Sequence, residues 1–504
     1  MLLRAAPVLI FVVVATVPSF ASGPSDLWTP ERLGRIRDRS TLAPQTVIHL
    51  GYSEVFYDSE IGDAKWGDAG PPYAVHTGET IRIHGYLASP LVGGPYPAVV
   101  IGHGHQGHGS PELALALAAF GYVALSIDGP GQGASTGPPD TEQAWVSVEE
   151  VANEPAPEVG YLYHYAYAAM RGLTLLDALS RLPFNPLRID RDRLGVVGAS
   201  MGGQLAYYVN GIDDRVKAAV ALAVAGGWDD VIRYPGSWLY HGLYYYTRDG
   251  LPSGLDGLNA ISDVCTDPTY DTFLEHFDPL RYAPTQHAPL LTIIGSHDQY
   301  FTVPAINSTY AAVDSAGTDP RFVKRILIAP NGKHEIGSGD DLVPVVADVD
   351  RWLRYCFQGG PAPPPTPAVE LVVAGDRLRF RVTAPAGSAP VVAVDLLYAT
   401  QIDTTRNPPC DYSALRLRRG RRDTADWGNS LPLGSIPPCG PPVSASNLLY
   451  YAQVTDAAGY TVSSPVQFRG REMTFGTDFV PVLEHFPRDD FEVPPPPGPC
   501  PARR

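Results

Sequence analysis

Charged residues and cysteines are scarce in this sequence. Of its 504 residues, 18% are charged and five are cysteines. Lys and Arg total 37 against 53 Asp and Glu, which gives a formal net charge of -16 at pH 7. A chain of this charge repels a phosphate backbone as a whole, so nucleic acid is not an expected partner. The glycine-rich run at 128–135 contains no Lys-Ser or Lys-Thr pair, which excludes a phosphate-binding loop there.

Long apolar runs are also absent, except at the beginning of the chain. Residues 5–17 are apolar, follow Arg4 and precede small residues up to Ala21, a spacing typical of a signal-peptidase site. The run is shorter than the about 20 apolar residues that cross a bilayer. We therefore predict a signal peptide over residues 1–21 and a secreted or periplasmic protein with no integral membrane segment after cleavage. The alternative is an N-terminal membrane anchor.

Export would place the cysteines where disulfides form. They are Cys265, Cys356, Cys410, Cys439 and Cys500. The odd number leaves at least one cysteine unpaired within a monomer. We predict a disulfide between Cys410 and Cys439; the alternative is five free thiols.

Strand-like and helix-like patterns alternate over residues 24–357, the predicted catalytic domain. The patterns VIHLGYSEVFY, TIRIHGYLASP and PAVVIG predict the opening strands, and helical patterns with further apolar strands follow. This alternation predicts an α/β fold, with a mostly parallel sheet, helices on both faces and a ligand site at the carboxyl ends of the strands.

The alternation stops over residues 227–284, which we interpret as a cap insertion. The segment is rich in aromatic residues, and Trp228, Trp238 and Tyr240 are candidate substrate-binding residues because aromatic faces bind sugar rings or aromatic acyl groups. The alternative is an ordinary packed subdomain, since clustered aromatic residues commonly form a core.

The remaining residues predict a second domain. Residues 358–368 are a proline-rich linker, residues 369–480 have strand patterns without helices, and residues 481–504 are a proline-rich tail. The strand patterns predict a small all-β sandwich. This domain is expected either to bind polysaccharide or a cell surface, or to pack on the catalytic domain.

The motif Gly198-Ala-Ser200-Met-Gly202-Gly203 follows an apolar strand and precedes a helical pattern. A serine on such a tight strand-to-helix turn has an exposed hydroxyl, and small neighbours prevent clashes at the turn. The hydroxyl needs a base and an orienting carboxylate to act as a nucleophile. Asp298 and His334 each follow a predicted strand and complete the order Ser, Asp, His; Asp229 or Asp230 is the alternative carboxylate.

An acyl carbonyl that becomes an oxyanion requires two backbone N–H donors. We expect one from Met201, directly after the serine, and one from His105 in the loop GHGHQGHG, with Gln106 as the alternative.

The same loop permits a rival hypothesis. His103, His105 and His108 have the spacing of a metal-binding loop, and His164 and His241 are possible further ligands. Against it, Gly107 stands where the metallo-β-lactamase pattern has an acidic residue, and the strand order predicts a parallel sheet rather than a sandwich. We expect neither a metal nor another cofactor.

From about Val47 to Cys356 the sequence resembles bacterial α/β-hydrolases, in particular the acetyl xylan esterase, cephalosporin-C deacetylase and dienelactone hydrolase-like groups. The resemblance rests on PAVVIGHGH, GYVALSIDGPGQGAS, RLGVVGASMGGQLA and the SHD and KHE positions. It implies Ser200 as nucleophile, His334 as base and Asp298 as orienting acid.

The resemblance also implies a function. We expect a secreted serine hydrolase that acts on small-molecule or carbohydrate esters with short acyl groups. The alternative is a peptidase of the prolyl oligopeptidase type, which needs an acidic anchor for a substrate amino group. Four glutamates before a long helical pattern are candidate anchors: Glu149, Glu150, Glu154 and Glu158.

Overall fold

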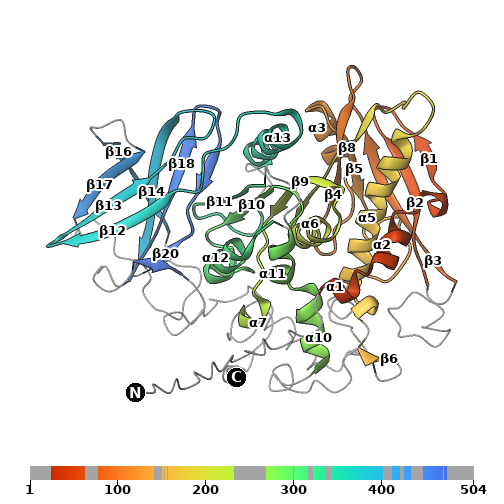
Figure 1. The fold of residues 1–504 in the computed structure, drawn as a ribbon, viewed down its shortest axis with the longest axis horizontal. Helices are drawn as coiled ribbons and strands as arrows, with labels where there is room; N and C mark the ends of the chain where they lie inside the picture. The colour runs from red at the N-terminus through yellow and green to blue at the C-terminus, as the bar shows by residue number, and fades with distance from the viewer. Residues whose placement is uncertain are drawn as a thin grey trace, which may run out of the picture.

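The fold has two parts, an α/β part and a C-terminal all-β part that lies beside it (Figure 1). The structure is a computed structural model. It describes residues 24–62, 78–140, 150–151, 154–155, 157–231, 268–298, 300–315, 322–336, 342–400, 411–420, 425–432, 447–468 and 470–473.

The α/β part is built on a nine-stranded sheet, counted over the described residues. Its strands are β1 (Gln45–Ile48), β2 (Ser53–Ile61), β3 (Thr80–Ala88), β4 (Tyr96–Gly102), β5 (Val123–Ile127), β8 (Ile189–Ala199), β9 (Val216–Leu222), β10 (Leu290–Gly295) and β11 (Lys324–Ala329). Their order is β1-β2-β3-β5-β4-β8-β9-β10-β11. The strands β5, β4, β8, β9, β10 and β11 are parallel, whereas β1, β2 and β3 are joined by antiparallel pairings. This arrangement confirms the predicted α/β fold.

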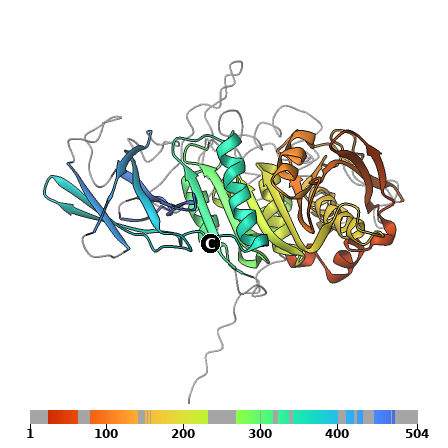
Figure 2. The same ribbon diagram turned by 90° about the horizontal axis from the view of Figure 1, so that it is seen from above.

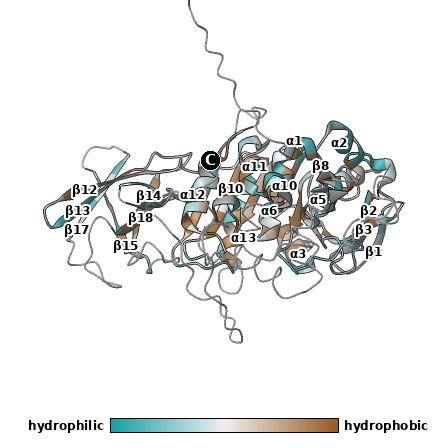
Figure 3. Ribbon diagram, turned by 90° about the horizontal axis from the view of Figure 1, so that it is seen from below, coloured by the Kyte–Doolittle hydropathy of each residue, from teal (hydrophilic) through white to brown (hydrophobic). Residues whose placement is uncertain are grey.

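Helices cover both faces of the sheet. The helices of this part, including three 3-10 turns, are α1 (Pro24–Leu27), α2 (Pro30–Ile36), η1 (Arg39–Thr41), α3 (Pro111–Ala119), η2 (Pro157–Val159), α5 (Tyr161–Ser180), α6 (Met201–Ile212), α7 (Trp228–Val231), α10 (Pro268–Phe277), α11 (Pro279–Tyr282), η3 (Ala283–Thr285), α12 (Val303–Ala312) and α13 (Leu342–Gln358). Buried residues of α3 and α13 form one core with the sheet, and those of α5, α6 and α12 form a second core on the other face. Figure 3 shows hydrophobic residues concentrated on the central strands, whereas α2 is largely hydrophilic.

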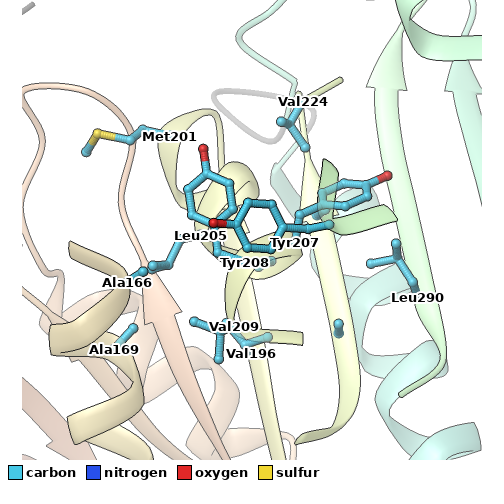
Figure 4. Packing of buried hydrophobic residues seen from close by; sticks show 14 of the residues in the cluster. Ala166, Ala169, Val196, Met201, Leu205, Tyr207, Tyr208, Val209, Val224 and Leu290 are labelled. Atoms are coloured by element: carbon cyan, nitrogen blue, oxygen red, sulfur yellow. The ribbon is translucent and has the colours of Figure 1, made fainter. Parts of the chain in front are cut away.

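The helix α6 follows the central strand β8, and most of its residues are buried. Leu205 and Val209 of α6 face Ala166 and Ala169 of α5 (Figure 4), and all four side chains are buried. Small residues on α5 let the two helices approach closely, so the beginning of α6 is fixed relative to the sheet.

The first predicted strand divides into two. β1 and β2 form a hairpin in which the His49 N–H donates to Tyr52 O at 2.9 Å, and Gly51 has φ +91°. The positive φ of Gly51 explains why a single strand cannot continue through this turn. Sequence patterns also did not indicate the short helices α1 and α2 that precede the hairpin. A separate two-stranded ladder is formed by β6 (Glu150–Val151) and β7 (Glu154–Pro155).

The C-terminal part consists of two antiparallel sheets, with a buried core between them. Its strands are β12 (Ala368–Ala374), β13 (Arg377–Thr383), β14 (Val391–Thr400), β15 (Ser413–Arg416), β16 (Arg418–Arg419), β17 (Asp426–Pro432), β18 (Leu448–Asp456), β19 (Thr461–Ser463), β20 (Gln467–Phe468) and β21 (Arg471–Glu472). The hairpin β12–β13 turns at Gly375 and Asp376, as the Gly-Asp pair predicts.

This β-domain packs against β11, the last strand of the central sheet (Figure 2). The Ile328 N–H donates to Ser463 Oγ at 2.9 Å, and Ile328 O accepts from Gln453 Nε2 at 2.7 Å. On α12, the Asn307 side chain pairs with both backbone groups of Val466. Buried β-domain residues share a core cluster with the α/β part, so the two parts form a continuous interface.

Several predicted features lie outside the described residues. These are the signal peptide, Trp238, Tyr240, the tail, and every cysteine except Cys356, which lies half-buried on α13. The proposed Cys410–Cys439 disulfide therefore stays a prediction. Among the described helices, none combines the length and apolar character needed to cross a bilayer.

Candidate active site

Ser200 lies between the end of β8 and the beginning of α6. Its φ of +57° and ψ of -118° are rare for a residue with a side chain, and such a conformation costs about 1–3 kcal/mol. The surrounding structure offsets this cost: the Ser200 N–H donates to Leu222 O at 2.9 Å, and Ser200 O accepts from the Gly203 N–H at 2.8 Å. The hydroxyl is thereby presented above the carboxyl ends of the parallel strands.

Glycine is required at position 202 because β4 approaches the turn closely. A Cβ atom at Gly202 would overlap the carbonyl oxygen of Gly102 and lie 2.9 Å from that of His103. Since a backbone carbonyl cannot move aside as a flexible side chain does, only a hydrogen fits there. This contact explains the glycine after Met201 in the motif.

His334 brings an imidazole to Ser200. Its Nε2 lies 2.8 Å from Ser200 Oγ, and its Nδ1 lies 2.9 Å from Asp298 Oδ2. The three residues come from the loops after β8, β10 and β11. The carboxyl ends of these strands lie at the same edge of the sheet because β8, β9, β10 and β11 are parallel and adjacent in this order. The predicted serine, histidine and aspartate are thus joined in one hydrogen-bonded chain.

Asp298 is held by a second set of hydrogen bonds. Its Oδ1 accepts from the N–H groups of Tyr300 at 2.8 Å and Phe301 at 3.0 Å, and its side chain is fully buried. These two donors fix the carboxylate so that only Oδ2 faces the imidazole. The alternative carboxylates, Asp229 and Asp230, lie on α7, and it is Asp298 that contacts His334.

The loop between β4 and α3 lies beside Ser200. A Cβ at Gly104 would contact Ser200 Cβ at 3.4 Å. The Gln106 N–H donates to Asp140 Oδ2 at 2.6 Å, so Gln106 is already committed. The His105 N–H and the Met201 N–H, at the first position of α6, stay the predicted oxyanion donors.

Asp140 is a residue of the site that the sequence did not indicate. It is buried, and its Oδ1 lies 2.8 Å from His105 Nδ1 while its Oδ2 accepts from Gln106. Both carboxylate oxygens thus hold the loop that carries the expected oxyanion donor. No local motif marks Asp140, because its partners lie more than 30 residues away along the chain.

The histidines of this loop face different partners. His103 Nε2 accepts from the Gly129 N–H at 2.7 Å, which requires that nitrogen to be unprotonated, and His103 Nδ1 lies 2.7 Å from Gly104 O. Burial lowers the pKa of His103, which agrees with a neutral ring. His108 Nδ1 lies 2.8 Å from Gly109 O. Within the described ranges, no group of three or more His, Cys, Asp or Glu side chains has the arrangement of a metal site.

The glycine-rich loop after β5 is anchored by Asp128. Its carboxylate accepts from the N–H groups of Gly109 at 2.7 Å and Ala134 at 2.9 Å, and His84 Nδ1 lies 2.7 Å away. Burial raises the pKa of Asp128, but the hydrogen bonds from His84 and the two N–H groups outweigh it and keep the pKa below its usual value. Asp128 therefore ties this loop to the loop beside Ser200.

Trp228 lies in the core rather than on a binding surface. It is 1% exposed, its ring stacks on Phe273 at 5.7 Å, and its Nε1 donates to Ala225 O at 3.0 Å. A ring covered in this way does not present a face to a substrate. An aromatic residue beside the site that we did not anticipate is Tyr300, whose ring centroid lies 4.3 Å from that of His334.

Two family models match overlapping parts of this chain. The acetyl xylan esterase (AXE1) family model matches residues 73–224, and the prolyl oligopeptidase family model matches residues 176–360. A Bacillus subtilis protein described only as a hydrolase, YtaP, is 26% identical over 231 residues, which are 42% of this chain and 68% of that protein. YuxL, an uncharacterised peptidase of the same organism, is 26% identical over 164 residues, 32% of this chain and 20% of its own.

Two solved structures are similar in fold to this chain. The acetyl xylan esterase from Paenibacillus sp. R4 has a TM-score of 0.48 and 19% sequence identity, and covers 66% of this chain and 93% of its own. Acetyl xylan esterase 1 from Thermoanaerobacterium sp. JW/SL YS485 has a TM-score of 0.45 and 18% identity, over 65% of this chain and 93% of its own.

Proposed function

Since the chain is a member of the α/β-hydrolase superfamily and resembles acetyl xylan esterases, we propose that it cleaves carboxylic esters through an acyl-enzyme on Ser200. The observation that carries the proposal is the hydrogen-bonded chain from Ser200 Oγ through His334 to Asp298. An isolated serine hydroxyl is a weak nucleophile, and an adjacent, oriented imidazole activates it.

The reaction proceeds in two steps. Ser200 Oγ attacks the acyl carbon while His334 Nε2 takes the hydroxyl proton; the ester C–O bond then breaks, and His334 gives the proton to the leaving alcohol. Water then attacks the acyl carbon while His334 Nε2 takes its proton; the bond between the acyl carbon and Ser200 Oγ breaks, His334 returns the proton to Ser200 Oγ, and the acid leaves. Asp298 stabilises the imidazolium, and the Met201 and His105 N–H groups bind the oxyanion, which is typically worth about 10²- to 10³-fold in rate per donor.

A carbohydrate ester with a short acyl group is the proposed substrate class. The resemblance to acetyl xylan esterases supports it, since that family model includes Ser200 and the loop beside it. The substrate-binding roles of Trp238 and Tyr240 stay part of this proposal, because both residues lie outside the described ranges. Trp228 is no longer part of this proposal, because its side chain is buried.

A serine peptidase is the second candidate function. The prolyl oligopeptidase family model spans all three residues Ser200, Asp298 and His334. A peptidase of that type requires an acidic anchor for the substrate amino group. One candidate anchor, Glu158, forms an ion pair with Arg32 at 2.9 Å, which competes with such a role for this glutamate.

A labelling experiment tests the nucleophile, and a substrate panel then separates the two candidates. We expect a fluorophosphonate to modify Ser200 in the mature protein and not in His334→Ala. The matched control is Ser180→Ala, at the C-terminal end of α5, which we expect to be labelled on Ser200 as in the wild type. The panel contains p-nitrophenyl acetate, butyrate and octanoate, acetylated xylan, and proline and alanine p-nitroanilides. Faster turnover of the anilides than of every ester would overturn the ester proposal, and failure of Ser200 to label would overturn both candidates.

Export is proposed on the N-terminal sequence alone. We propose that residues 1–21 direct secretion and are removed. Expression in a bacterial host followed by N-terminal sequencing of the extracellular or periplasmic material checks this, because retention of the intact N-terminus in the cytoplasm would contradict it.

A further inference from the structure

We propose that Tyr412 of the β-domain is a positioning residue that holds together the two loops carrying Asp298 and His334, an inference that rests on the proposed function. These loops, residues 296–298 and 331–334, follow β10 and β11. Loops are the mobile part of most scaffolds, yet hydrogen-bonded catalytic groups require a fixed geometry. The β-domain supplies part of the rigidity that this site needs.

The first contact is between Asn331 and the backbone of Tyr412. Asn331 Oδ1 accepts from the Tyr412 N–H at 2.6 Å, and Asn331 Nδ2 donates to Tyr412 O at 3.1 Å. The side-chain amide of Asn331 therefore satisfies both backbone groups of one residue in the other domain. Asn331 has φ +58°, a conformation that asparagine adopts more readily than most residues, and it begins the turn that leads to His334.

The same asparagine is tied to the Asp298 loop. The Asn331 N–H donates to Ser296 Oγ at 2.8 Å, and Ser296 Oγ lies 2.9 Å from His297 Nδ1. The His297 N–H donates to Gly332 O at 2.9 Å. These bonds lock the two loops to each other directly before Asp298 and His334.

Tyr412 contacts the Asp298 loop as well as Asn331. Its ring meets that of His297 edge to face, with centroids 5.8 Å apart and an interplanar angle of 82°. The ring also packs against Tyr451 of β18 at 5.2 Å, and the Tyr451 hydroxyl donates to Ile328 O at 3.2 Å. Tyr412 is only 6% exposed, so its contacts on both loops are backed by the β-domain core.

This arrangement assigns the β-domain a part in the reaction. The contact with the β-domain fixes the position of Asp298 relative to His334. The position of His334 in turn affects the proton transfer from Ser200. A misplacement of about 1 Å from a change remote from the reacting atoms can cost about 10²-fold in rate. Loss of the Asn331–Tyr412 pair should therefore lower kcat rather than weaken substrate binding.

The test uses the full-length protein and the variant Asn331→Gly. Glycine tolerates φ +58°, so the substitution removes the amide without backbone strain. The matched control is Asn307→Ala: the Asn307 amide pairs with Val466 across the same domain interface, but from helix α12. Tyr412→Phe is a second control, because among the described residues its hydroxyl has no hydrogen-bond partner, and the pairing uses the backbone.

We expect Asn331→Gly to reduce both kcat for p-nitrophenyl acetate and the rate of fluorophosphonate labelling by about 10- to 100-fold, with KM changed by less than about 3-fold. Asn307→Ala and Tyr412→Phe should stay within about 2-fold of the wild type. A labelling rate of Asn331→Gly within 2-fold of the wild type would overturn the inference. Equal slowing by Asn331→Gly and Asn307→Ala would also overturn it, because that result indicates general loosening of the interface.

A spectroscopic measurement separates this inference from the proposed function. If the wild type neither labels nor cleaves esters, the proposed function fails. The downfield proton resonance of the His334 Nδ1–H bonded to Asp298 still reports the positioning. Broadening or loss of this resonance in Asn331→Gly, but not in Asn307→Ala, would support it; an unchanged resonance would refute it.

Discussion

Replacement of Asp298 by asparagine tests the orientation of His334 with almost no change in side-chain shape. Oδ1 of Asp298 accepts from two backbone N–H groups, at 2.8 and 3.0 Å. An asparagine must keep its oxygen at that position, because its NH2 group would oppose two donors there. The NH2 group then faces His334 Nδ1, which must become the acceptor and leave the proton on Nε2.

In that tautomer the imidazole points an N–H group at Ser200 Oγ and is unable to take its proton. The same substitution in a serine protease triad lowers kcat by about 10⁴-fold, and we expect a loss of that order here, equivalent to about 5 kcal/mol of transition-state stabilisation. Stability should change little, since each backbone donor keeps its acceptor.

The assay is p-nitrophenyl acetate hydrolysis under saturating substrate, with thermal unfolding measured on the same samples. Asp278→Asn is the matched control: Asp278 is also buried and accepts from the N–H groups of Gly227, Trp228 and Leu280, but it caps α11. We expect this control to lower the unfolding temperature and to leave kcat within about 10-fold of the wild type. A kcat for Asp298→Asn within 10-fold of the wild type would refute the assigned role of the carboxylate.

Three further predictions concern the packing at Gly202, the charge of Asp128 and the N-terminal sequence. Gly202→Ala, whose methyl group overlaps the Gly102 carbonyl, should lower the free energy of unfolding by about 3 kcal/mol in urea titrations, and an unchanged midpoint would contradict the close approach. The pKa of Asp128 lies below its usual value in the folded protein, so its stabilising effect is present above about pH 4 and is lost as the pH falls through the folded pKa. Asp128→Asn should therefore flatten the fall in stability below about pH 4, and an unaltered slope in acid titrations would count against it. In secreted material, Edman sequencing should begin near Ser22, directly after Ala21.

The central sheet could be predicted because its strands are continuous apolar runs separated by helical patterns. Ser200, Asp298 and His334 follow three such runs, and parallel strands bring their ends together. The residue types alone do not indicate that these three side chains lie close together, whereas the order and direction of the strands do. The prediction of an α/β fold with an appended β-domain is confirmed for this reason.

Other parts of the site were hidden because they depend on tertiary contacts. Trp228 shows that a cluster of aromatic residues does not tell a buried core from a binding surface, since both bury rings. Asp140 and Tyr412 contact loops that lie 35 and 81 residues away along the chain, and neither belongs to a local pattern. Sequence periodicity indicates the secondary structure of a segment, but it does not indicate hydrogen bonds between residues far apart in the chain.

The contact between the β-domain and β11 has a consequence for solubility. A terminal strand of a sheet offers unpaired backbone groups that other chains can join, which leads to aggregation. Here side chains satisfy groups of this strand: Ser463 accepts from the Ile328 N–H, while Tyr451 and Gln453 donate to Ile328 O. The β-domain thus protects the end of the sheet without extending it. A chain truncated after α13 would expose this strand together with the apolar surface around it, and we expect it to self-associate.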